Sequence, residues 1–108
     1  MFYANHVGAQ TDLIFDGGSL VVSPDLHVYD ELPYFQEDLR VYDLEAVVKG
    51  GVNNEQPKEK TNLIHDTLLL GIRDYFRKLG FKKAILGLSG GIDSAVTAVL
   101  ASRALGPD

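Results

Sequence analysis

The sequence predicts an α/β protein in two parts, with strands in the first half and the order helix, strand, loop, helix in the second. Three observations support this prediction. Short apolar segments between Gly, Pro and Asp turns fill residues 1–48, a polar connector follows at 49–60, and apolar residues recur at helical spacing from residue 61. Because a strand flanked by helices is the repeating unit of an open α/β sheet, the second half is interpreted as the start of such a sheet.

The first half contains several segments with the composition of strands, bounded by turn residues. Asp16-Gly17-Gly18 suits a tight hairpin turn between two of these segments, and Pro24-Asp25 suits a second turn. Pro33 confines residues 32–35 to a sheet edge or a loop, because proline cannot donate to a strand ladder. The expected strands are residues 2–7, 13–15, 19–23, 27–29 and 39–44.

The second half contains two expected helices around a buried strand at 84–88. The first helix starts with Thr61 or Asn62 as its cap and ends at Gly80, a candidate left-handed cap. The second helix runs from about Ser94 to Leu105, before Gly106-Pro107. The apolar face of the first helix, expected in the core, consists of Ile64, Leu68, Ile72, Tyr75, Phe76 and Leu79. A solvated face is expected at Arg73, Asp74, Arg77 and Lys78.

The connector at 49–60 combines two glycines, a proline and alternating charges, which is typical of an interdomain linker. We therefore expect one domain at 1–48, a linker at 49–60 and a second domain at 61–108. A lone parallel strand is not stable, since parallel sheets need strand neighbours and covered faces. The chain is accordingly expected to be a piece of a larger protein.

The composition excludes several classes of protein. Of the 108 residues 45% are hydrophobic, and no apolar run approaches the roughly 18–20 residues that span a bilayer. The start lacks the features of a secretory signal, so a cytoplasmic protein without membrane contact is expected. With no cysteine, disulfides, thiolate metal sites and thiol nucleophiles are excluded. Residues 1–60 hold 4 basic against 11 acidic side chains, which argues against binding to nucleic acid.

The most informative segment, Ser89-Gly90-Gly91-Ile92-Asp93-Ser94, lies between the expected strand and the second helix. Its glycines let the backbone approach a ligand, and its two serines add hydroxyl donors. The first N–H groups of a helix have no partner within the helix, and the helix dipole attracts anions. The segment therefore predicts a phosphate or pyrophosphate site.

Asp93 is the unusual member of this segment, because a pyrophosphate repels a carboxylate. Either Asp93 caps the helix and points away from the ligand, or a Mg²⁺ ion lies between the two anions. Both interpretations stay open from the residues alone.

Other interpretations of these residues fit less well. A Walker-type loop needs a lysine that is absent here. Residues 87–91 match the Gly-x-Ser-x-Gly nucleophile elbow, but residues 92–108 contain no histidine to complete a triad. An ordinary strand-to-helix turn with serine caps would be the better interpretation if only part of the Ser-Gly-Gly-x-Asp-Ser pattern were present. Here every specified position of the pattern is filled.

The segment Ser89 to Ser94 resembles the pyrophosphate loop of N-type ATP pyrophosphatases, which transfer AMP to a substrate and release pyrophosphate. Within that group, the stretch from Gly71-Ile72-Arg73-Asp74-Tyr75-Phe76 through Gly80-Phe81-Lys82-Lys83 to Ala95 is similar to NAD synthetase. Residues 3–10 and 13–19 resemble late strands of the nitrilase-like glutaminase domain in glutamine-dependent NAD synthetases.

This resemblance implies that residues 1–48 end a nitrilase-like α-β-β-α domain. It implies that residues 61–108 open a Rossmann-like, adenine-nucleotide alpha hydrolase-like domain. The implied enzyme adenylates nicotinic acid adenine dinucleotide with Mg-ATP, and ammonia from glutamine then displaces AMP to give NAD. A homo-oligomer is expected. Carried over by position, the ATP-binding residues are Gly87, Leu88, Ser89, Gly90, Gly91, Ile92, Asp93 and Ser94, with Asp93 as the magnesium ligand.

The glutaminase cysteine is absent, so this chain holds no catalytic residue of that domain and is expected to be inactive alone. GMP synthetase and asparagine synthetase share the loop class but carry glutaminase domains of other types. A non-catalytic ATP-binding module and, more distantly, a serine hydrolase using Ser89 are the alternatives from other classes.

Overall fold

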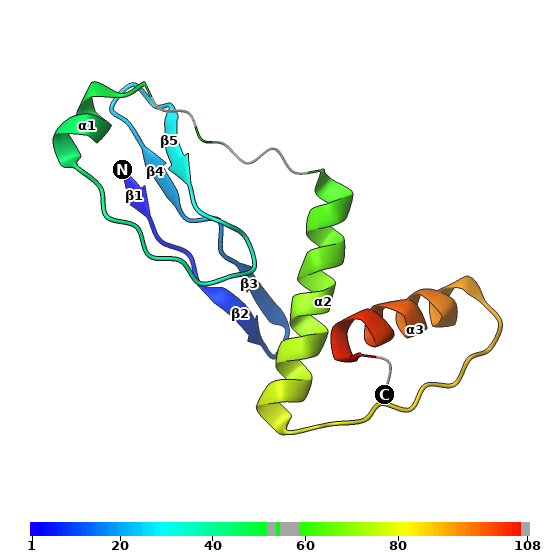
Figure 1. Cartoon of the computed structure of the whole chain (residues 1–108). Coiled ribbons are helices and arrows are strands. Elements are labelled where there is room, and N and C mark those ends of the chain that lie inside the picture. Colours follow the sequence, from blue (N-terminus) through cyan, green and yellow to red (C-terminus); the bar gives the residue numbers. More distant parts are fainter. Residues whose placement is uncertain (52–53, 55–58, 107–108) are drawn as a thin grey trace. The chain divides into compact units, whose positions relative to one another are not determined.

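A computed structural model describes residues 1–51, 54 and 59–106, and it is of the mixed α/β class that the sequence predicts (Figure 1). The chain divides into two compact units. Unit 1 consists of Met1–Val7 and Phe15–Glu59, and unit 2 consists of Gly8–Ile14 and Lys60–Asp108. Within the described residues, no helix combines the length and the apolarity needed to cross a bilayer.

Unit 1 is built on an antiparallel sheet with the strand order β1-β4-β5 (Figure 1). The strands are β1 (Phe2–Tyr3), β4 (Leu20–Val22) and β5 (Val28–Glu31). Pro24-Asp25 forms the predicted turn between β4 and β5, and the register of this pair shifts at Val21/Val22. Val21 on the central strand β4 is 2% exposed. Val47, in helix α1 (Leu44–Lys49), is also buried.

The predicted hairpin turn at Asp16-Gly17-Gly18 is wrong, because the strands on either side of it belong to different sheets. Strand β3 (Leu13–Asp16) pairs with β2 (Val7–Gln10), whereas β4 pairs with β1 and β5. Gly17 instead donates its N–H to the carbonyl of His6 at 2.9 Å and forms an isolated bridge with Tyr34. A turn at Thr11-Asp12 joins β2 to β3 instead. The expected single strand at 2–7 is interrupted: residues 2–3 form β1, and Val7 begins β2.

The predicted strand at 39–44 is also wrong: residues 39–43 form no strand, and helix α1 (Leu44–Lys49) begins where the strand should end. Asp43 caps α1 by accepting the N–H of Glu45 at 2.9 Å, a helix-start signal that competes with strand pairing. The segment is attached to the sheet through the side chains of Arg40 and Tyr42, while Leu39 and Val41 are exposed.

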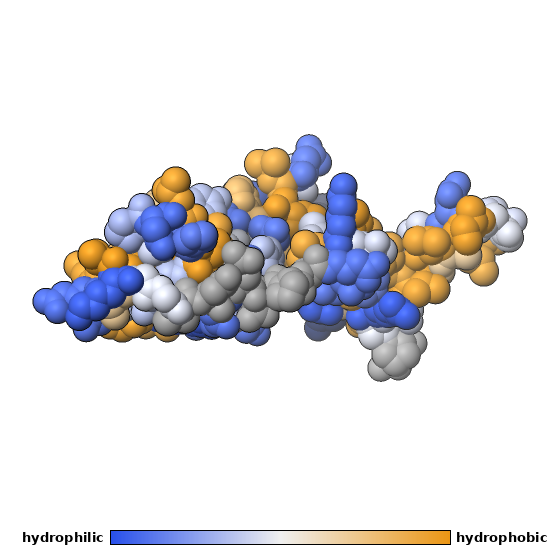
Figure 2. All heavy atoms as spheres, turned by 90° about the horizontal axis from the view of Figure 1, so that it is seen from above, coloured by the Kyte–Doolittle hydropathy of each residue, from blue (hydrophilic) through white to orange (hydrophobic). Residues whose placement is uncertain are grey.

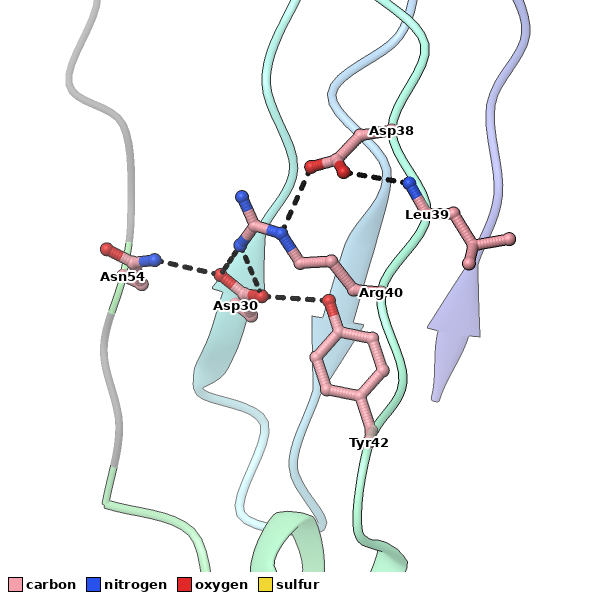
Figure 3. A network of polar contacts seen from close by, with 6 residues as sticks. All are labelled: Asp30, Asp38, Leu39, Arg40, Tyr42 and Asn54. Carbon is pink, nitrogen blue, oxygen red and sulfur yellow. Dashed lines mark hydrogen bonds and ion pairs between the residues drawn. The ribbon is translucent and has the colours of Figure 1, made fainter.

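Asp30 is the centre of this attachment (Figure 3). Its carboxylate accepts from Arg40 Nη1 at 2.7 and 2.9 Å, from the Tyr42 hydroxyl at 2.8 Å and from Asn54 Nδ2 at 3.0 Å. Burial raises the pKa of Asp30, but the donors from Arg40, Tyr42 and Asn54 together outweigh it, so the pKa is lowered. Burial and the Asp30 carboxylate raise the pKa of Tyr42 to about 12. The ionised form of Asp30 therefore holds residues 38–43 to β5.

Replacing Asp30 by asparagine is expected to reduce the free energy of unfolding by about 1.5–3 kcal/mol, because it removes a buried charge that several donors satisfy. The pKa of Asp30 is lower in the folded state, so its stabilisation is present above pH 4 and is lost as the pH falls through the folded pKa. Urea unfolding followed by circular dichroism between pH 3 and 7 measures both effects. Asp38→Asn, a more exposed carboxylate on the same Arg40, should have a smaller effect.

Unit 2 contains the hairpin tip at 8–14 and two helices that pack against each other, α2 (Lys60–Leu79) and α3 (Ile92–Leu105). Helix α2 begins at Lys60, so Thr61 and Asn62 lie inside its first turn rather than at its cap. Gly80 follows with φ of 71°, which confirms the predicted left-handed end. Gly106 ends α3 as expected. Pro107 and residues 52, 53 and 55–58 of the predicted linker lie outside the described residues.

The predicted buried strand at 84–88 is not formed: residues 81–91 have no regular structure, and residues 81–90 are exposed. A parallel strand is stable only between hydrogen-bonded neighbours with both faces covered. Within the described part of the chain, nothing pairs with this segment. Its apolar side chains Ile85, Leu86 and Leu88 are exposed, and Figure 2 shows orange, apolar atoms on the surface of the molecule.

The apolar face of α2 is likewise only partly covered in this chain. Ile64, Leu68, Tyr75 and Leu79 remain exposed, so the expected core is incomplete. Tyr75 and Phe76 form an aromatic cluster with Phe81, with ring centroids 5.9–6.3 Å apart.

Candidate functional site

The loop before α3 has the backbone conformation that its glycines make possible. Gly90 adopts φ of 84°, in the left-handed region that side chains with a Cβ rarely adopt. Gly91 is the N-cap residue of α3 with an extended backbone (φ −83°, ψ 160°), and no side chain caps this helix start within the described residues. The loop therefore turns sharply and leaves the first N–H groups of a 14-residue helix without a side-chain acceptor.

The serines at the two ends of the loop lie together, as a phosphate loop requires. Ser89 Oγ and Ser94 Oγ are 3.0 Å apart, and Ser94 Oγ donates to the Gly91 carbonyl at 3.0 Å. The N–H groups of Ser89 and Gly91 donate to these hydroxyls at 3.3 and 3.4 Å. The hydroxyls thus satisfy one another and the loop backbone, and hydroxyl rotation frees both as donors to an anion.

Asp93 is the second residue of α3 and is exposed. Because Gly91 occupies the N-cap position and no side-chain cap hydrogen bond forms, the capping interpretation of Asp93 is wrong. Among the described residues, no group of three or more His, Asp or Glu side chains is arranged to hold a metal. The role of Asp93 as a magnesium ligand stays a prediction.

The remaining predicted site residues are two that precede the loop and one within it. Gly87 and Leu88 lie in the exposed segment before it, and Ile92 is the first residue of α3. The segment is open to solvent, apart from the half-buried Ser94. A neutral apolar cavity would be a poor site for a triphosphate, and this exposed, donor-rich loop is chemically the better candidate.

Unit 2 also contains an apolar cavity of about 530 Å³ between the hairpin tip and α2. Its lining includes Ala9, Ile14, Leu68, Ile72, Tyr75 and Phe76, and none of the predicted loop residues. An apolar lining cannot compensate the charge of phosphates, so this cavity is separate from the candidate ATP site.

Asp74 is a residue whose place the sequence interpretation missed. It was expected on a solvated face with Arg73, Arg77 and Lys78, but it is 5% exposed. The N–H of Ala9 lowers the pKa of Asp74, burial opposes this, and the charges of Arg77 and Lys78 lower the pKa further. Spacings of three and four residues are common on exposed helices. The spacing of Asp74 from Arg77 and Lys78 therefore did not predict that the N–H of Ala9 would donate to Asp74 and that Asp74 would be buried.

The chain is similar to known proteins along its whole length. Residues 64–108 match the family model described as NAD synthase. The glutamine-dependent NAD(+) synthetase of Synechocystis is 45% identical, over all of this chain and 20% of the relative. That of Rhodobacter capsulatus is 42% identical, over 98% of this chain and 20% of the relative.

A solved structure of glutamine-dependent NAD+ synthetase from Acinetobacter baumannii in complex with ADP is similar in fold. The TM-score is 0.85 at 41% identity, covering 97% of this chain and 20% of that one. This chain therefore spans about a fifth of the length of the relatives it matches. By sequence and by fold, this chain is similar to a segment of glutamine-dependent NAD(+) synthetases.

Proposed function

We propose that this chain is part of an ATP-dependent ligase that converts nicotinic acid adenine dinucleotide to NAD, with ammonia from glutamine. The observation that carries the proposal is the loop at 89–94. Its two hydroxyls and its uncapped helix start converge at one place. The relatives named above are glutamine-dependent NAD(+) synthetases, and one of them binds ADP, which supports an adenine nucleotide as the ligand.

The proposed reaction has two steps. A carboxylate oxygen of nicotinic acid adenine dinucleotide attacks the α-phosphorus of ATP, which breaks the bond to the pyrophosphate and releases it. Ammonia then attacks the activated carbonyl carbon, AMP leaves with the bonding electrons, and the amide of NAD is formed. Adenylation is needed because a free carboxylate is a poor electrophile.

The loop residues have distinct roles in the first step. The backbone from Gly87 to Ser94 with the hydroxyls of Ser89 and Ser94 binds the departing pyrophosphate, whose charge grows as the bond breaks. Asp93 is the proposed ligand of Mg²⁺, and its exposed carboxylate in the first turn of α3 fits the oxygen donors that this ion prefers. The ion would neutralise phosphate charge.

We further propose the finer assignment of the fold. Residues 1–48 end a nitrilase-like glutaminase domain, residues 49–60 are a linker, and residues 61–108 open a Rossmann-like ATP pyrophosphatase domain. The antiparallel strands of unit 1 and the loop before α3 in unit 2 support this division.

The proposal is tested in a protein that extends this chain to the full length of its relatives. Exchange of labelled pyrophosphate into ATP should depend on nicotinic acid adenine dinucleotide, and NAD should form with either ammonia or glutamine. Exchange that responds instead to xanthosine monophosphate or to aspartate would assign the chain to another amidotransferase. ATP binding without exchange would make it a non-catalytic module.

Replacing Ser94 by alanine is expected to raise the KM for ATP by about tenfold, because it removes a hydroxyl that contacts both Ser89 and Gly91. The measurement is pyrophosphate exchange over a range of ATP concentrations. Ser102 is an exposed serine on the same helix, and its carbonyl accepts the N–H of Gly106. The control variant Ser102→Ala should keep a KM for ATP within about twofold of the parent value. Equal KM values for both variants would contradict the role of Ser94.

A further inference from the structure

One residue of the hairpin tip, Ala9, is held on both sides of its backbone by side chains of α2. The N–H of Ala9 donates to Asp74 Oδ2 at 2.9 Å, and Lys78 Nζ donates to the carbonyl oxygen of Ala9. Strand β2 has β3 as its neighbour in a two-stranded sheet. An edge strand presents unpaired N–H and C=O groups, and here a helix satisfies them in place of another strand.

The two elements are shaped for this contact. Gly8 adopts φ of 130°, and a Cβ there would lie 3.0 Å from Asp74 Oδ2. A Cβ at Gly71 would lie 2.7 Å from Ile14 Cδ1, so the missing side chain makes room for Ile14 on the helix. Gly71, Asp74 and Lys78 are three and four residues apart, which places them on one face of α2. That face accepts the hairpin.

The electrostatics also favour a specific contact over a surface ion pair. Asp74 is buried, and besides the Ala9 N–H it has Arg77 Nη2 at 2.9 Å and Lys78 Nζ at 3.7 Å. A buried carboxylate is destabilising unless it is paired and hydrogen-bonded. Arg77 and Lys78 lie on α2 itself, whereas the bond from the Ala9 N–H forms only while the hairpin tip lies on the helix.

We propose that Asp74 and Lys78 are positioning residues that hold the hairpin tip at 8–14 on α2 and thereby couple glutamine hydrolysis to amide formation in the full-length enzyme. This inference rests on the proposed function, in which residues 1–48 belong to the glutaminase part and α2 to the synthetase part. Val7, where β2 begins, and Asp16, where β3 ends, belong to unit 1, whereas the tip at residues 8–14 belongs to unit 2. The hairpin is therefore covalently shared by both units. Its contact with α2 is a direct restraint between the two functions.

The test uses the full-length enzyme and compares three rates: glutamine hydrolysis, NAD formation with glutamine and NAD formation with ammonia. In Asp74→Ala, NAD formation with glutamine should fall about tenfold, while the other two rates stay within about twofold. Glutamine hydrolysed per NAD formed then rises by about tenfold. Lys78→Met, which removes one donor, should show the same pattern with a smaller change. Asp66→Ala, a more exposed acid on the same helix, is the matched control and should leave all three rates unchanged.

Hydrogen exchange supplies a second measurement that does not depend on turnover. Amides in residues 8–14 should exchange faster in Asp74→Ala than in Asp66→Ala. If NAD formation with ammonia and with glutamine falls equally, Asp74 is merely structural and the inference is overturned. If Asp74→Ala does not fold, an unchanged ratio in Lys78→Met overturns it as well. An unmodified enzyme that makes NAD from neither nitrogen source would instead contradict the proposed function.

Discussion

Replacing Asp93 by alanine is expected to lower ATP–pyrophosphate exchange by about 10²–10³-fold in the full-length enzyme, because the variant loses the proposed magnesium ligand beside the departing pyrophosphate. Glutamine hydrolysis should continue, since the proposed function assigns this reaction to the other part of the protein. The measurement pairs labelled pyrophosphate exchange with a glutaminase assay on the same preparation.

Two further variants separate metal binding from general disruption of the loop. Asp93→Asn keeps the size of the side chain but removes its charge, and its activity should recover in part at high Mg²⁺ concentration. Asp66→Ala removes an acid from α2 and should leave exchange unchanged. Exchange at the parent rate in Asp93→Ala would exclude the assigned role of this carboxylate.

Replacing Gly90 by alanine is expected to reduce exchange by about tenfold or more, because an alanine at φ of 84° is strained by about 1–2 kcal/mol and the loop will shift to relieve it. No atom lies within 4 Å of the position of the added Cβ, so the expected effect comes from the backbone conformation and not from a clash. ATP titrations of pyrophosphate exchange measure it.

Gly87→Ala provides the comparison for this prediction. The added methyl group there also meets nothing within 4 Å, and Gly87 is not among the glycines with positive φ. Its loss of activity should therefore be smaller than that of Gly90→Ala. If the two variants lose activity equally, the left-handed conformation at Gly90 is not what shapes the site.

The parts of the fold that were predictable from sequence are those encoded by neighbouring residues. The helical spacing of apolar residues located α2 and α3, and Gly80 and Gly106 marked their ends. The loop at 89–94 was found because all of its determinants lie within six residues. The turn at Pro24-Asp25 was predictable for the same reason.

The parts that were not predictable depend on distant partners. The glycines at 17 and 18 have turn composition, but pairing with residues 6 and 34 sends the adjoining strands into different sheets. Arg40 and Tyr42 are spaced two residues apart, as side chains on one face of a strand are. They nevertheless contact the sheet by donating side-chain hydrogen bonds to Asp30. Asp74 is buried by a backbone group 65 residues away, which no local pattern encodes.

The exposed segment at 84–88 has a consequence for the folding of the chain, because apolar residues without a partner can aggregate. Ile85, Leu86 and Leu88 are exposed here, on a backbone that pairs with no strand within the described residues. An exposed apolar segment of this kind can pair with the same segment of a second copy during synthesis. Shielding these few residues is therefore expected to limit aggregation of the nascent chain.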